Sequence, residues 1–203
     1  MRKSLITLAL IGLLAVPAMA AQTYTYDWSG DADYLGCFGS DASAEIYALQ
    51  DHTGDGGGSL LLTKNNWGPY ANGFVASVWG LQEGDEVTVT CWRYDNYSSM
   101  PYFALWSHYN DALEEAADAR GQDMAVDDGN CYGNSQLGVQ NGWEEYSHTW
   151  TIGAGHTGLV IDAQVYGSTG AYMLVDDLSI TVPDHASVRT PDTVYPAGGE
   201  PTA

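Results

Sequence analysis

The sequence predicts an all-β protein: a two-sheet antiparallel β-sandwich of the jelly-roll type with one short helical insertion. Runs that alternate apolar and polar residues, or that are rich in β-branched residues, recur along the chain between Gly-, Asn- and Asp-containing turns. Helix formers gather in one stretch, DALEEAADAR at residues 111–120. About nine strands without a second helix are typical of two sheets that enclose one core.

Four strands are predicted before the QEGD turn at residues 82–85. The first alternates polar and aromatic side chains (QTYTYDW), and the second is AEIYAL. The third is the short apolar run SLLLT between HTGDGGG and NNWGP, and the fourth is GFVASVWGL. These strands span residues 22–28, 44–49, 59–63 and 73–81.

Five strands are predicted after that turn. Val and Thr alternate in the first of them, the second is rich in aromatic residues, and GSTG separates the last two. These strands span residues 86–94, 101–109, 146–152, 158–166 and 171–182. The side chains expected in the core are Val87, Val89, Phe103, Leu105, Trp150, Ile152, Leu159, Ile161, Val165, Leu174, Leu178 and Ile180.

The two ends of the chain differ from the predicted domain, residues 21–183. Residues 1–20 have a basic start, the apolar run LITLALIGLLAV and a final Ala-Met-Ala, as in a secretion signal that is cleaved near Ala20. The run is too short for a transmembrane helix, so we expect a secreted protein without a membrane anchor. Residues 184–203 are rich in Pro, Thr, Gly and Ala without periodicity, which predicts a flexible tail.

Charge limits the possible partners. The chain has 6 Lys and Arg residues against 26 Asp and Glu residues, a formal net charge of −20. Nucleic acid and anionic lipid would be repelled. We therefore expect a partner that is neutral or cationic, or a metal ion.

The three cysteines are too few for a disulfide scaffold and have no metal-ligand spacing. Cys91 alternates in step with Val87 and Val89, which predicts a buried thiol. Cys37 and Cys131 lie in loop-like sequence and could pair, although the sequence does not choose among the possible pairings.

Aromatic rings lie on the strand faces opposite the aliphatic residues. Clustered exposed rings mark binding surfaces, and flat rings mixed with polar groups suit a sugar. The alternative is that the insertion at residues 110–142 folds over these rings as a second core. The candidate ligand-binding residues are Trp92, Tyr94, Tyr102, Trp106, His108, Asp162, Gln164 and Tyr166.

Four motifs occur in an order similar to that of the carbohydrate-binding modules of the CenC-like type (families four, nine and twenty-two), which have a galactose-binding-like jelly roll. They are DGGGSLLLT, GLQEGD with VTVTCWR, WEEY with WTI, and YMLVDDLSI, and the resemblance covers roughly Tyr24 to Val182. The usual N-terminal F-E-x-G is replaced by YDWSGD. The resemblance implies a glycan cleft on the concave sheet and one structural calcium.

The residues also favour a calcium site. Asp176 shares its alternation with Leu174, Leu178 and Ile180, which predicts a core-facing carboxylate that is costly unless it is paired or bound to a metal. The alternative is a carboxylate at the sheet edge, hydrated or hydrogen-bonded to backbone amides. The resemblance implies a calcium that links the first strand, the HTGDGGG turn and the last strand. The candidate ligands are Asp176, Asp27 and Asp55, with the outward Asp177 as a weaker candidate.

Catalysis is not expected. The carboxylate pairs Glu144/Glu145 and Asp176/Asp177 are neighbours within strands and point to opposite faces, so neither can flank a glycosidic bond. A pair drawn from separate strands stays open, and the few basic residues disfavour a lyase. We therefore expect a secreted, non-catalytic protein that binds a neutral polysaccharide or oligosaccharide. The alternative is an extracellular structural or adhesive sandwich of a cell surface or matrix.

Overall fold

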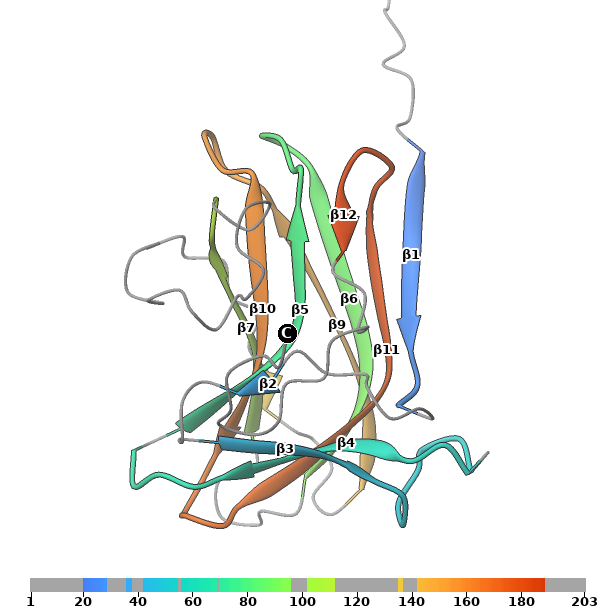
Figure 1. The fold of residues 1–203 in the computed structure, drawn as a ribbon, viewed down its shortest axis with the longest axis vertical. Coiled ribbons are helices and arrows are strands. Elements are labelled where there is room, and N and C mark those ends of the chain that lie inside the picture. Colours follow the sequence, from blue (N-terminus) through green and yellow to red (C-terminus); the bar gives the residue numbers. More distant parts are fainter. Residues whose placement is uncertain are drawn as a thin grey trace, which may run out of the picture.

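The structure is a computed structural model that describes part of the chain. The described residues are 20–28, 36–37, 42–54, 56–68, 70–95, 102–111, 135–136 and 142–188. Within these ranges the regular secondary structure is entirely β-strand, arranged as two facing antiparallel sheets (Figure 1). The predicted helix at residues 111–120 lies outside the described residues except for Asp111.

Sheet A contains the first strand of the fold and its longest strand. Its order is β3 (Ala42–Tyr47), β4 (Ser59–Lys64), β11 (Tyr172–Pro183), β6 (Glu86–Asp95) and β9 (Trp143–Thr151). The first strand, β1 (Ala21–Tyr26), pairs with the second half of β11, whereas β4 pairs with its first half. In Figure 1, β3 and β4 accordingly cross the lower end of the molecule while β1 runs beside the upper part of β11.

Sheet B faces sheet A across the core. Its order is β12 (Ser187–Val188), β5 (Tyr70–Trp79), β10 (Gly158–Tyr166), β7 (Tyr102–Tyr109) and β8 (Ser135–Gln136), with β2 (Gly36–Cys37) also paired with β5. Strands distant in sequence are neighbours in both sheets, as in a jelly roll. The predicted fold class is confirmed.

The core lies between the sheets, and most of the predicted core residues are in it. Trp150 is 3% exposed, and it packs with Ile152, Leu178 and the alternating aliphatic residues of β6 and β10. Cys91 is a buried free thiol, as predicted, and burial raises its pKa to about 12. The side chains of Phe103 and Cys37, and all of Cys131, lie outside the described part of the chain.

A β-bulge in β11 changes which side chains face the core. Asp177 has a φ of 48°, and the pairing of β11 with β6 shifts register between Asp176 and Ser179. The β11 side chains in the core are Met173 and Val175 before the bulge and Leu178, Ile180 and Val182 after it. Leu174 is fully buried, as predicted, although it is not part of the cluster between the sheets. The prediction that Asp176 faces that cluster is wrong, because one inserted residue reverses the alternation of a strand.

The sheets extend beyond residue 183, where the tail was predicted to begin. Ala186 and Val188 are buried in the core, and β12 pairs with β5. The remainder of the predicted tail and the predicted secretion signal, except Ala20, are outside the described residues. No helix long and apolar enough to cross a membrane occurs in the part of the chain that the structure describes.

Candidate functional site

The predicted ligand-binding residues lie on two different sheets. Strand β6 carries Trp92 and Tyr94 on the outer face of sheet A, whereas β7 and β10 belong to sheet B. The remaining candidates with described side chains lie on the outer face of sheet B, because their neighbours Leu105, Ala163 and Val165 are in the core. They are Trp106, His108, Asp162, Gln164 and Tyr166. The eight residues therefore do not form one continuous surface.

On sheet B, polar side chains from adjacent strands are deeply buried. Asp162 of β10 is directly opposite Trp106 of β7, and Val160 is opposite His108. Asp162 is 0% exposed, Gln164 1% and His108 5%. Nδ1 of His108 lies 3.5 Å from Oδ2 of Asp162, which is longer than a good hydrogen bond.

These buried groups have unused hydrogen-bonding capacity. Among the described residues, no hydrogen-bond partner is found for either carboxylate oxygen of Asp162, either ring nitrogen of His108, Nε2 of Gln164 or Oγ of Ser77. Ser77 is part of the same face because it is opposite Val160. A buried polar atom without a partner costs about 1–3 kcal/mol, so proteins rarely keep several in one place. We call Ser77, His108, Asp162 and Gln164 the polar cluster.

Burial also affects the charge of the cluster. It raises the pKa of Asp162, because the charged form loses its hydration, and the contact with His108 acts in the opposite direction. The structure thus favours a carboxyl group that keeps its proton above the usual pH range of an aspartate.

Two half-buried rings accompany the polar cluster. Trp106 lies opposite Asp162, and the hydroxyl of Tyr166 donates to Oε1 of Gln164 over 2.7 Å. This bond fixes the amide of Gln164 and leaves its Nε2 for another acceptor. Tyr102 has its backbone in β7, but its side chain is outside the described part.

The candidates on sheet A form a separate ring cluster. The ring of His52 stacks on Trp92 with centroids 3.8 Å apart and planes 14° apart. Trp143 contacts His52 edge-on at 5.7 Å and Tyr94 at 5.5 Å. One face of Trp92 is therefore covered by the β3–β4 connection, which the alternation of β6 did not predict.

Asp176 adjoins this cluster on the outer face. Its Oδ2 accepts a hydrogen bond from the amide of His52 at 2.9 Å, and its Oδ1 from the amide of Asp177 at 2.8 Å. Asp177 in turn contacts Nδ1 of His52 at 2.8 Å. Burial, with smaller contributions from the charges of Asp177 and Asp51, raises the pKa of Asp176 to about 6. The amide bonds match the alternative considered for this carboxylate from the sequence.

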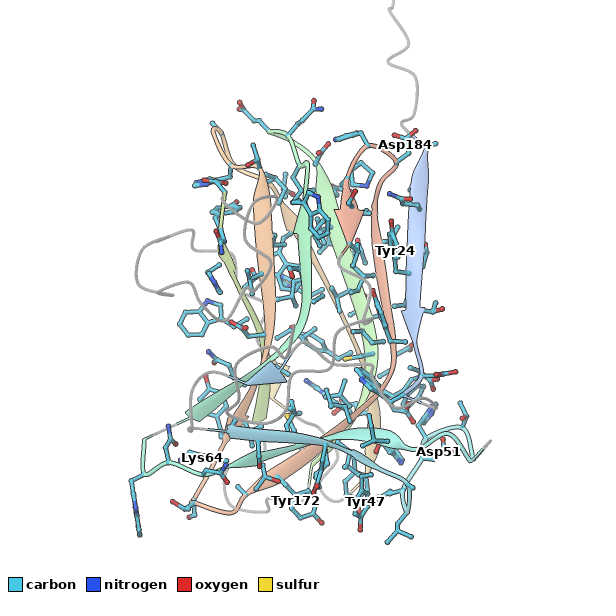
Figure 2. All side chains as sticks on the ribbon, in the orientation of Figure 1. Tyr24, Tyr47, Asp51, Lys64, Tyr172 and Asp184 are labelled. Carbon is cyan, nitrogen blue, oxygen red and sulfur yellow. The ribbon has the colours of Figure 1, made fainter. Side chains whose placement is uncertain are left out.

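The predicted calcium ligands are only partly visible. Asp55 is outside the described residues, and Asp27 follows the end of β1. Among the described residues no group of three or more His, Cys, Asp or Glu side chains is placed to hold a metal ion. Asp51 (Figure 2) instead accepts four hydrogen bonds within its own turn. Although burial acts to raise the pKa of Asp51, these bonds lower it.

One exposed residue was not identified from the sequence. Trp67 is 95% exposed in the connection between β4 and β5. The carbonyl of Asn66 accepts hydrogen bonds from Nζ of the fully buried Lys64 (Figure 2) and from Oγ1 of Thr169. The amide of Gly170 donates to the carbonyl of Lys64 at 2.7 Å. Because these bonds hold the backbone of the turn, less backbone conformational entropy is lost when the ring binds a ligand.

Trp67 also lies near one end of the sheet B face. Its connection leads directly into Tyr70, which pairs with Tyr166 of β10. The signal in the sequence is the turn NNWGP, in which an apolar Trp occupies a position that turns usually give to a polar residue. Its exposure could not be inferred without the structure.

Comparisons with known proteins identify the fold. No family model matches the chain, and no curated protein matches it. Solved structures do: the CBM22-1 xylan-binding domain of Paenibacillus barcinonensis Xyn10C has a TM-score of 0.50 at 12% identity, over 82% of this chain and 97% of that one. The C-terminal family 22 carbohydrate-binding module of Clostridium thermocellum Xyn10B has a TM-score of 0.52 at 12% identity, over 80% and 94%.

A third match extends the comparison. The CBM22-1–GH10 modules of Clostridium thermocellum Xyn10B, complexed with xylohexaose, match with a TM-score of 0.51 at 14% identity, over 77% of this chain and 28% of that one. The fold of this protein is thus the jelly roll of carbohydrate-binding modules. At these identities the likeness establishes the fold, and the function must be argued from the site.

Proposed function

We propose that this protein is a secreted, non-catalytic carbohydrate-binding protein that recognises a neutral glycan on the outer face of sheet B. The observation that carries the proposal is the polar cluster with its unused donors and acceptors. Sugar hydroxyl groups both donate and accept, so they can satisfy a protonated carboxyl, an imidazole, an amide and a hydroxyl together. Trp106 and Tyr166 supply rings for the apolar faces of the sugar.

We propose that Trp67 also contacts the glycan, because its turn leads to the end of sheet B where Tyr70 pairs with Tyr166. The segments on both sides of it carry no charged residue: neither residues 65–82 nor residues 163–175 contain Asp, Glu, Lys or Arg. In a chain with 26 acidic residues, this uncharged end favours a neutral ligand.

The proposal of a binding protein rather than an enzyme rests on the same cluster. Glycoside hydrolysis generally needs two carboxyl groups on either side of the scissile bond. Within the described residues the cluster has one, Asp162. His108 is its titratable neighbour.

A second candidate function is a structural or adhesive sandwich. The complete burial of Asp162 favours it, because a covered face would serve as a second core. The two functions differ in what happens when a glycan is offered to the protein.

The test is a glycan array with the mature protein, followed by calorimetry with xylohexaose and sedimentation with insoluble xylan. We expect binding to a neutral glycan, and Trp67→Ala is expected to weaken it about fivefold or more through lost stacking, with an unchanged melting temperature. Leu49→Ala is the matched control, since Leu49 is 85% exposed in another connection. Absence of binding to every glycan would favour the structural sandwich.

We also propose one structural calcium ion at Asp176, with Asp27 and Asp55 as further ligands. Asp176 is 2% exposed and lies close enough to Asp177 and Asp51 for their negative charges to raise its pKa. Each of its carboxylate oxygens has one amide partner and can accept a further contact. A divalent cation bound there would offset the concentration of negative charge.

This site leads to a prediction about pH. Because the folded-state pKa of Asp176 is raised to about 6, the folded protein binds this proton more tightly than the unfolded chain does. The stabilisation that the proton provides is fully present below about pH 4 and is lost as the pH rises through 6. In calcium-free buffer the unfolding free energy should fall by up to about 3 kcal/mol over this range. Added calcium should restore it by stabilising the ionised form. Asp176→Asn should remove both responses in thermal melts. Calcium-independent melts of the wild type would refute the calcium site.

A further inference from the structure

The strands of sheet B contain a single acidic residue and a single histidine. In a chain with 26 Asp and Glu residues, the described strands of this sheet include no Lys or Arg, and their only acid and histidine are Asp162 of β10 and His108 of β7. The other titratable residues in these strands are tyrosines and Cys37. In Figure 1, β7 and β10 lie side by side, which brings the two charged groups together on one face.

His108 and Asp162 are each other's only polar side-chain contact among the described residues. Nδ1 of His108 lies 3.5 Å from Oδ2 of Asp162, and no hydrogen-bond partner is found for either ring nitrogen or either carboxylate oxygen. Both side chains are more than nine-tenths buried. Because neither charge has another partner, the protonation of one group depends on that of the other, and the two titrate as a pair.

The pair is electrically neutral when it holds one proton. That proton is either on the carboxyl group or, beside an ionised carboxylate, on the imidazole ring. Loss of the proton leaves one negative charge, and gain of a second proton leaves one positive charge. A buried charge without a partner is costly, so burial favours the neutral pair over both charged forms. In agreement, burial raises the pKa of Asp162 and the contact with His108 lowers it.

We propose that the proton shared by His108 and Asp162 controls glycan binding. The site binds a neutral glycan while the pair is neutral, and it releases the glycan as the pair becomes negatively charged. The inference rests on the proposed function of this face and adds its regulation. Asp162 contacts the sugar, whereas His108 acts through Asp162 and is a positioning residue.

The physical reason is the hydration that a negatively charged pair requires. In the free protein the charge draws water toward this face, which lowers its cost. A bound glycan displaces that water, and the hydroxyl groups of a neutral sugar carry no compensating charge. The neutral pair, in contrast, both donates and accepts hydrogen bonds, as sugar hydroxyls do. Binding is therefore linked to retention of one proton.

The test is calorimetry at constant salt, with xylohexaose and with the neutral oligosaccharide that binds most strongly on the array. The measurements extend from about pH 5 to about pH 9, a range that includes the ordinary pKa of imidazole and the raised values of buried carboxyl groups. Since one proton is involved, the affinity of the wild type should fall by up to about tenfold for each pH unit above the point at which the pair loses it.

Variants assign this response to the pair. Asp162→Asn keeps the shape and the hydrogen-bonding groups but cannot ionise, so its remaining affinity should not fall as the pH rises. His108→Gln removes one of the two places for the proton, so the affinity should fall at a lower pH than in the wild type. His156→Gln is the matched control and should keep the wild-type profile, because His156 contacts Asp111 at 3.1 Å outside the strands of sheet B. Melting temperatures verify that each variant is folded.

The outcomes separate this inference from the proposed function. A fall in affinity that the His156 variant keeps and that Asp162→Asn abolishes supports the inference. Affinity that is constant with pH overturns it and leaves the proposed function intact. Affinity that rises with pH also overturns it, because the ionised carboxylate would then be the form that accepts hydrogen bonds from the sugar. A His108→Gln profile equal to that of the wild type overturns the sharing of the proton. Failure to bind any glycan at any pH overturns the proposed function as well.

Discussion

Replacement of Trp150 by alanine is expected to lower the free energy of unfolding by about 3–5 kcal/mol. The side chain is 3% exposed and fills the core between β9 and the opposing sheet, so truncation leaves a cavity. Its ring also contacts His148 edge-on, with centroids 4.7 Å apart. For a domain of this size the melting temperature should fall by roughly 10 °C.

A neighbouring control makes this result specific. Thr151→Ala alters an exposed position of the same strand and should change the unfolding free energy by no more than about 0.5 kcal/mol. Chemical denaturation of both variants measures the difference. Equal stability of the Trp150 variant and the wild type would mean that β9 does not present this face to the core.

Asp162→Ala is expected to weaken glycan binding at least about tenfold while the protein stays as stable as the wild type or becomes more stable. A buried carboxyl group with no hydrogen-bond partner destabilises the fold, so its removal relieves that cost. The same group would be satisfied by a bound sugar, and a site that has lost it leaves sugar hydroxyls unpaired. Loss of affinity without loss of stability is the pattern of a binding residue.

Isosteric replacement refines this prediction. Asp162→Asn keeps the shape and the ability to donate and accept, so it should retain more affinity than alanine. Calorimetry with the glycan identified on the array measures the affinities, and thermal melts measure stability. A marked fall in melting temperature with unchanged affinity would instead show that the polar cluster serves the packing of this face.

Sequence patterns predicted most of the fold because they are local. The alternation of Val87 and Val89, or of Leu159 and Ile161, specifies which face of a strand is apolar without knowledge of its neighbours. The turn sequences bounded the strands in the same way. The burial of Trp150 and Cys91 therefore followed from sequence.

The candidate site was predicted only in part. Alternation predicted that His108, Asp162 and Gln164 point away from the aliphatic side of their strands. The structure brings the three residues together on sheet B. Their burial and their lack of partners had no signal in the sequence, and the turn NNWGP marked Trp67 without fixing its exposure. These properties depend on which segments cover each face, and that is decided by contacts between distant parts of the chain.

The sequence by itself determined the all-β class, the approximate strands and the inward set of most of them. Only the tertiary structure decided that β6 and β7 belong to different sheets, which separates Trp92 from Trp106. It also decided the bulge at Asp177, which turns Asp176 outward, and the pairing of β7 with β10, which brings His108 near Asp162. The physical reason is that alternation relates residues within one strand, whereas sheet membership and register arise from pairing between strands far apart in sequence.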